Sequence, residues 1–137
     1  MATIALATYV LKACLLQIAA DNYEKHVAAA TLAPTVNGQT FKAIDGSVTR
    51  DTSVPEWTLT LDYAQVWTTA NSLAAYLLAN VGTQKTIILS PLGSTAGKPK
   101  FTVDVMIVPG PVGGKVDDIQ TASVTLVCIG QPVKATW

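Results

Sequence analysis

The sequence predicts a mainly β domain, a β-sandwich or open barrel with one short flanking α-helix. Three observations support this fold class. Apolar and polar residues alternate in several short runs, turn-forming Gly, Pro and Asn residues separate these runs, and only one segment has helical periodicity. The 137 residues fit a single domain, 1–137, that buries roughly two-thirds of the surface exposed by the unfolded chain.

Residues 2–20 are apolar apart from a few polar side chains, and Lys12 is their only charged residue. No basic residue precedes Lys12, so the run lacks the start of a signal peptide. A membrane-spanning helix would place Lys12 inside the bilayer at a cost of about 3 kcal/mol. We therefore expect the stretch to remain in the mature fold as a strand buried on both faces, containing Val10, Leu11, Ala13, Cys14, Leu15, Leu16 and Ile18.

A turn at Asp21-Asn22 precedes a second extended run, Tyr23–Leu32, which we expect Pro34 to close. The alanines of this run favour a strand only weakly. His26 is the only histidine, and a lone histidine on an edge strand is typical of a surface or interface position.

Residues 35–55 are the most polar part of the chain and contain two hairpin-turn dipeptides, Asn37-Gly38 and Asp45-Gly46. A connection of about twenty residues is far longer than the usual 2–6. The turn signals and the interleaved apolar residues favour a protruding hairpin over a slack linker. These apolar residues are Phe41, Ile44 and Val48.

The segment 57–82 changes from strand to helix periodicity. Its first seven residues place Trp57, Leu59, Leu61 and Tyr63 on one face of a half-buried strand. A helix of about twelve residues then follows, too short to be stable without packing on the sheet. The side chain that caps its start would come from Thr68, Thr69, Asn71 or Ser72. Its packing residues are Leu73, Tyr76 and Leu77, and Val81 follows at the same helical spacing. Gly82 would end the helix.

Three further strands are expected in the last third of the chain. They cover Lys85–Leu89, Phe101–Val108 and Thr121–Ile129, and the last two alternate clearly between apolar and polar residues. Loops rich in glycine and proline separate them. Gly130-Gln131-Pro132 should begin a short tail.

The charge content argues against several classes of function. Charged residues make up 13% of the chain, against about 25% in ordinary soluble domains, and nine basic residues balance nine acidic ones. A strong basic patch for nucleic acid is therefore absent. So little charge suggests a surface covered by other copies or by partners; a monomer with a Thr- and Ala-rich surface is the alternative.

No set of residues predicts catalysis, a cofactor or a metal. Gly93–Lys98 has the wrong glycine spacing for a phosphate-binding loop, and Pro99 stands where a magnesium-binding hydroxyl is needed. Asp117-Asp118 has no histidine or cysteine beside it. Cys14 and Cys128 are read as small buried residues in a reducing compartment. We therefore expect a structural or binding protein rather than an enzyme.

The order of elements resembles the major tail tube proteins of long-tailed (siphovirus-type) bacteriophages. The resemblance covers roughly residues 24–133. It rests on a WT-L-L strand, a Ser-Leu-x-x-Tyr-Leu helix, a Gly-Thr turn and a following strand in VPEWTLTLDYAQVWTTANSLAAYLLANVGTQKTIILSP, and on the closing pattern FTVDVMIVPGPVGGKVDDIQTASVTLVCIGQPV. Residues before 24 match less well.

The resemblance implies a virion protein of the phage tail, assembled in the host cytoplasm, whose six-copy rings stack into a tube for DNA ejection. Its partners would be further copies of itself and the tape-measure, tail-tip or terminator proteins, with duplex DNA passing unbound and no membrane involved. The implied ring-stacking loop contains Asn37, Gly38, Phe41, Lys42, Ile44, Asp45, Gly46, Arg50 and Asp51. Two alternatives stay open: a monomeric β-sandwich module that binds carbohydrate or protein, and a tail terminator or capsid decoration protein.

Overall fold

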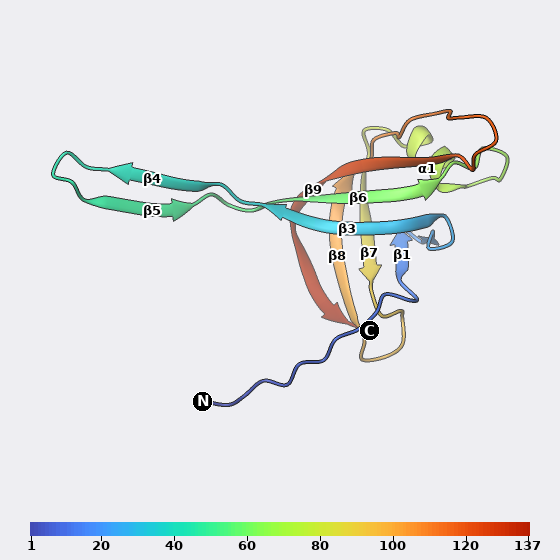
Figure 1. Ribbon diagram of the computed structural model, residues 1–137. Coiled ribbons are helices and arrows are strands. Elements are labelled where there is room, and N and C mark those ends of the chain that lie inside the picture. Colours follow the sequence, from blue (N-terminus) through green and yellow to red (C-terminus); the bar gives the residue numbers. More distant parts are fainter.

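The computed structural model describes residues 1–137 and confirms a mainly β fold with one short helix (Figure 1). Seven strands form one antiparallel sheet, and two more form a hairpin that projects from it. The elements are β1 (Leu15–Ile18), β2 (Asp21–Asn22), β3 (Val27–Thr35), β4 (Gly38–Lys42), β5 (Val48–Thr52), β6 (Glu56–Ala64), α1 (Leu73–Ala79), β7 (Gln84–Ser90), β8 (Pro99–Met106) and β9 (Thr121–Thr136).

The sheet has the order β2-β1-β7-β8-β9-β6-β3 and folds over along β9. Residues 121–127 of β9 pair with β6, whereas residues 128–136 pair with β8. In Figure 1, β3 and β6 consequently run across the direction of β7 and β8. The two halves of the sheet enclose the core between them.

The core consists of 18 buried apolar residues contributed by both halves of the sheet and by α1. The predicted alternation is confirmed in β6, where Leu59, Leu61 and Tyr63 are buried. In β9, Ala122, Val124, Leu126 and Cys128 are buried while the residues between them are exposed. Period-2 patterning thus decides which face of each strand points inward.

The last strand does not end at residue 129, as the sequence predicted. It continues through Gly130-Gln131-Pro132 to Thr136, so the expected tail is a strand. Gly130 has a φ of 85°, a conformation that glycine adopts at little cost, and it lies just after β9 leaves β6 for β8. The glycine therefore bends the strand instead of ending it.

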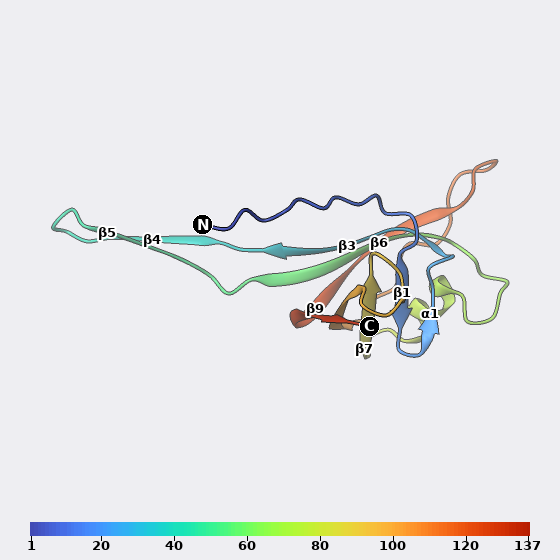
Figure 2. The same ribbon diagram turned by 90° about the horizontal axis from the view of Figure 1, so that it is seen from below.

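The prediction that residues 2–20 form a strand buried on both faces is wrong. Residues 1–14 belong to no helix or strand, and only Leu16 and Ile18 of the four-residue β1 are buried. Figures 1 and 2 show this N-terminal arm (residues 1–14) leaving the domain beside β1. β1 pairs with β2 on one side and with β7 on the other. No free strand edge therefore lies beside β1 with which the arm could pair.

The second extended run begins later than expected and passes through its proline. Tyr23 is buried ahead of a turn, and β3 starts at Val27. Pro34 lies inside β3, opposite Trp57 of β6. Because β3 is at the edge of the sheet, an absent N–H can face away from the ladder without losing a hydrogen bond.

The helix is shorter than the sequence suggested, with seven residues instead of about twelve. Ser72 is its N-cap and Asn80 its C-cap. Gly82 has the expected positive φ but lies beyond the cap, where its N–H donates to the carbonyl of Ile107. Val81 is half exposed and outside the helix, so it contributes nothing to the packing face.

Replacing Ser72 by alanine should lower the free energy of unfolding by about 0.5–2 kcal/mol. The buried Ser72 hydroxyl donates to the carbonyl of Val66 at 2.5 Å and accepts from the N–H of Ala75 at 3.4 Å, and alanine removes both bonds. Urea titration would measure the change. Ser94→Ala in an exposed loop is the matched control and should leave stability unchanged.

Candidate functional site: the projecting hairpin

The most distinctive surface feature is the hairpin formed by β4 and β5, which projects far beyond the sheet (Figure 1). Its strands pair only with each other, from Gly38 opposite Thr52 to Lys42 opposite Val48. All ten strand residues are exposed. The predicted protrusion at residues 35–55 is therefore present as a two-stranded ribbon.

The tip of the hairpin is a tight turn at Asp45-Gly46, as predicted. The carboxylate of Asp45 accepts hydrogen bonds from the hydroxyl and the backbone N–H of Ser47, at 2.6 and 2.9 Å. These bonds stabilise the charged form and lower the pKa of Asp45. Gly46 has a φ of 90°, which glycine adopts without strain.

The other predicted turn, Asn37-Gly38, lies at the base of the hairpin. The N–H of Asn37 donates to the Ser53 hydroxyl at 2.9 Å, and the N–H of Ser53 donates to the Asn37 carbonyl at 2.8 Å. Gly38 is already the first residue of β4. The reading of this dipeptide as a turn was wrong, because the chain runs on from β3 into β4 there.

The two faces of the ribbon differ in chemistry. Opposed residues of an antiparallel pair share a face, so Thr40, Lys42 and Arg50 lie together on one side. Phe41 and Asp51 lie on the other. Phe41 is 69% exposed and Ile44, beside the tip, is fully exposed. The ring-stacking residues named from the sequence therefore all lie on the hairpin or at its base, and none is anchored in the core.

The helix-packing residues lie at the opposite end of the domain from the hairpin (Figure 1). Leu73 and Leu77 are fully buried in the core, and Tyr76 packs against it while half-buried. The rings of Tyr76 and Tyr23 are 5.7 Å apart between centroids, and burial raises the pKa of both hydroxyls. All three residues therefore lie where the helix meets the sheet.

An aromatic cluster beside the helix was not foreseen from the sequence. The ring of His26 packs edge-on against Tyr23 with 6.2 Å between centroids. The hydroxyls of Tyr23 and Tyr76 and Nδ1 of His26 are buried without a hydrogen-bond partner. His26 is thus half-buried rather than on the surface. The cluster was missed because Tyr76 lies far along the chain from Tyr23 and His26, so no local pattern links the three residues.

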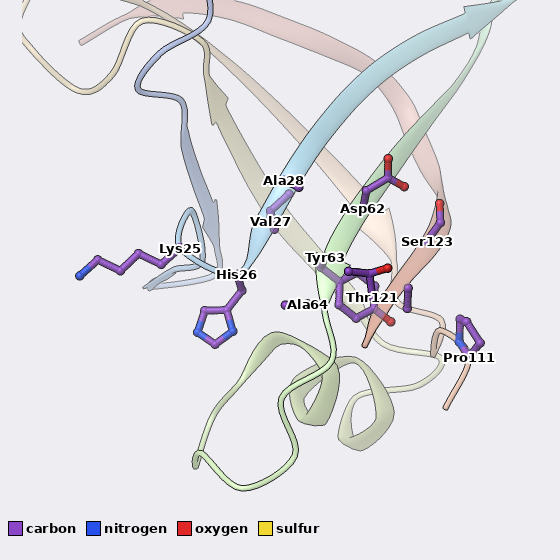
Figure 3. Close-up of a pocket in the computed structure, with 11 residues that line it drawn as sticks. Lys25, His26, Val27, Ala28, Asp62, Tyr63, Ala64, Pro111, Thr121 and Ser123 are labelled. Atoms are coloured by element: carbon purple, nitrogen blue, oxygen red, sulfur yellow. The ribbon is translucent and has the colours of Figure 1, made fainter. Parts of the chain in front are cut away.

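A groove of about 690 Å³ lies between β3, β6 and the start of β9, and Figure 3 shows its lining. Its charged groups are Lys25 and Asp62, whose side chains point away from each other. Nowhere in the chain do three or more His, Cys, Asp or Glu side chains gather to hold a metal ion. The groove therefore offers a surface for contact with another molecule, and its lining shows no metal-binding cluster.

The two cysteines are free: Cys128 is buried and Cys14 is half-buried. Burial raises the pKa of both thiols, so the reactive thiolate is disfavoured at neutral pH.

No helix of the structure is long and apolar enough to cross a membrane. In comparisons with known proteins, the chain matches no family model and no curated sequence.

Proposed function

We propose that this chain is a structural subunit whose copies form rings that stack into the tail tube of a long-tailed bacteriophage. The observation that carries the proposal is the projecting hairpin. A two-stranded ribbon is at best marginally stable in water by itself, and this one exposes every strand residue. It therefore has the form of an element that becomes ordered against a neighbouring molecule.

The surface chemistry of the hairpin supports contact with a neighbour. An exposed Phe41 and Ile44 supply apolar area, and Lys42, Arg50 and Asp51 supply both signs of charge. Five extended residues span about 17 Å, enough to reach well into an adjacent molecule. In the proposed tube, the hairpin of each subunit contacts the next ring.

The low charge of the chain fits a conduit for DNA. Each phosphate contact by Lys or Arg would hold the duplex, and nine basic residues balanced by nine acidic ones leave little basic surface for such contacts. In this proposal the chain assembles in the host cytoplasm, becomes part of the virion tail, and contacts tape-measure, tail-tip or terminator proteins.

A monomeric binding module is the second candidate, favoured by the groove between β3, β6 and β9. Such a module would stay monomeric when concentrated and would use the groove rather than the hairpin. A tail terminator or capsid decoration protein would associate without extending into long tubes.

Replacing residues 38–52 by a short Gly-Ser linker should abolish tube formation and leave the domain folded. The hairpin pairs with no other strand, and loop closure entropy depends only weakly on length. Negative-stain microscopy would give particle length, and thermal melting would report folding. Tubes of normal length from the deleted chain would refute the stacking role.

A finer variant separates the side chains of the hairpin from its length. Phe41→Ser with Ile44→Ser should shorten or prevent tubes with an unchanged melting temperature, since neither side chain packs in the core. The matched control is Val116→Ser with Ile119→Ser, two exposed apolar residues in the loop between β8 and β9. If the control disrupts tubes to the same extent, general surface hydrophobicity rather than the hairpin drives assembly.

A further inference from the structure

The N-terminal arm is apolar, extended and unpaired. Met1, Ile4 and Leu6 are about nine-tenths exposed or more, and no residue from 1 to 11 is charged. No backbone hydrogen bond joins residues 1–13 to the rest of the chain. Ile4 and Leu6 are alternate residues, so they lie on one side of an extended segment, with Ala5 and Ala7 on the other. The arm thus has the pattern of a strand and no partner in its own chain.

An apolar groove of about 640 Å³ opens where the two halves of the sheet diverge. The half formed by β3 and β6 contributes Leu32 and Trp57, and the other half contributes Phe101 and Pro132. The indole N–H of Trp57 is buried without a hydrogen-bond partner. This nitrogen has almost no exposed surface, so Trp57 offers the groove its apolar ring rather than its N–H.

The groove borders an open sheet edge. β3 ends the strand order and has no charged residue among its nine, although proteins commonly protect exposed edges with lysine or other charges. Pro34 blocks only its far end, while Ala30, Thr31 and Leu32 lie in the groove wall. An extended segment in the groove can therefore add to β3 as a further strand.

We propose that residues 2–8 of one copy bind in this groove of a second copy, adding along β3 with Ile4 and Leu6 facing inward. Tyr9 and Leu11 of the receiving copy form part of the wall of its groove. The arm of that same copy therefore leaves the domain at the rim of the groove. Neither residues 2–8 nor β3 carry a charged side chain, and Lys134 is the one charged residue in the groove lining. This association needs only two copies and does not depend on the proposed tube.

The buried area indicates that each copy both donates and receives an arm. A fully buried aliphatic side chain removes roughly 60–120 Å² from water, so Ile4 and Leu6 together remove roughly 120–240 Å². Stable interfaces bury about 800 Å² on each partner. One arm falls far short of this area, and a copy that gives one arm and receives another doubles the buried side-chain area, to which the backbone buried along β3 adds. The exchange then produces a closed pair, a ring or an open chain.

Sedimentation velocity of the full chain over a wide concentration range provides the first test. The wild type should associate, and Ile4→Asp with Leu6→Asp should weaken association by on the order of 100-fold or more, because two carboxylates would enter an apolar groove. The matched control, Ala5→Asp with Ala7→Asp, puts the same charge on the opposite face and should still associate. A monomeric wild type, or equal loss in both double variants, would overturn the proposal.

The position of the arm can be mapped by photocrosslinking. A diazirine side chain placed at position 6 of one chain, mixed with ¹⁵N-labelled unmodified chain, should crosslink to the labelled chain at Leu32, Trp57, Phe101 or Pro132. Crosslinks confined to the unlabelled chain would show that the arm folds back on itself. The hairpin is intact in all these variants, so failure here is distinct from failure of ring stacking.

Discussion

Leu77→Asp should prevent the domain from folding. Leu77 is fully buried where α1 packs on the sheet, and no basic side chain lies in the core to pair with a carboxylate. An uncompensated buried charge costs about 3–5 kcal/mol, a large part of the 5–15 kcal/mol that stabilises a typical domain. Soluble expression and circular dichroism would report the loss.

Leu78→Asp is the matched control for this substitution. Leu78 is the next residue along the helix, is 54% exposed, and should accept the same carboxylate with little change in melting temperature. Ala75→Ser at a half-buried position should also be tolerated. A soluble Leu77→Asp protein with the wild-type melting temperature would contradict the observed packing of α1.

Gly110→Ala should lower the free energy of unfolding by about 1–3 kcal/mol, the usual cost of overpacking. A Cβ atom at Gly110 would overlap the hydroxyl of Tyr63. Tyr63 is only 2% exposed and packs in the core, so moving its ring away would disturb the residues packed around it. Urea titration would measure the loss.

Two comparisons identify the cause of that loss. Gly38→Ala adds the same methyl group where no atom lies within 4 Å, and it should leave stability nearly unchanged. Tyr63→Phe removes the overlapped hydroxyl, so Gly110→Ala should cost less in a Tyr63→Phe background than in the wild type. Equal costs in both backgrounds would exclude the overlap as the cause.

The strands inside the sheet could be predicted because each buries one face. Trp57 to Tyr63, Phe101 to Ile107 and Ala122 to Cys128 alternate in the sequence. The structure buries the inward-facing position of every alternation in these runs, apart from the partly buried Trp57 and Phe101. Ser72 was among the expected capping residues. The period-2 pattern therefore predicts both these strands and the face that each one buries.

Strand ends were harder to predict because they depend on a partner. Gly130-Gln131-Pro132 has turn chemistry, yet the neighbouring β8 keeps this segment in the sheet. Residues 10–14 have the apolar character of a strand, yet no strand of the chain lies free beside β1 to receive them. For Gly130-Gln131-Pro132, pairing with a distant segment overrides the local preference for a turn. For residues 10–14, no distant segment pairs with them, so their local preference for a strand is not realised.

The hairpin could be predicted in outline, and its faces could not. Its length and the Asp45-Gly46 turn indicated a protrusion, but Asn37-Gly38 proved to lie at the base. Which side chains share a face follows from the pairing register, such as Thr40 opposite Arg50, which the sequence does not specify. The groove at Trp57 was missed because its walls come from six separate segments of the chain.

The way in which the hairpin joins the sheet determines how a pull on its tip is resisted. The ribbon continues directly from β3 and into β6, so tension along it acts lengthwise on both strands (Figure 1). Besides packing in the core, only the ladder between β6 and β9, seven residue pairs long, joins these two strands to the rest of the sheet. Its hydrogen bonds lie perpendicular to that tension and are therefore sheared together instead of peeling one at a time. The domain is consequently built to withstand axial load at the hairpin.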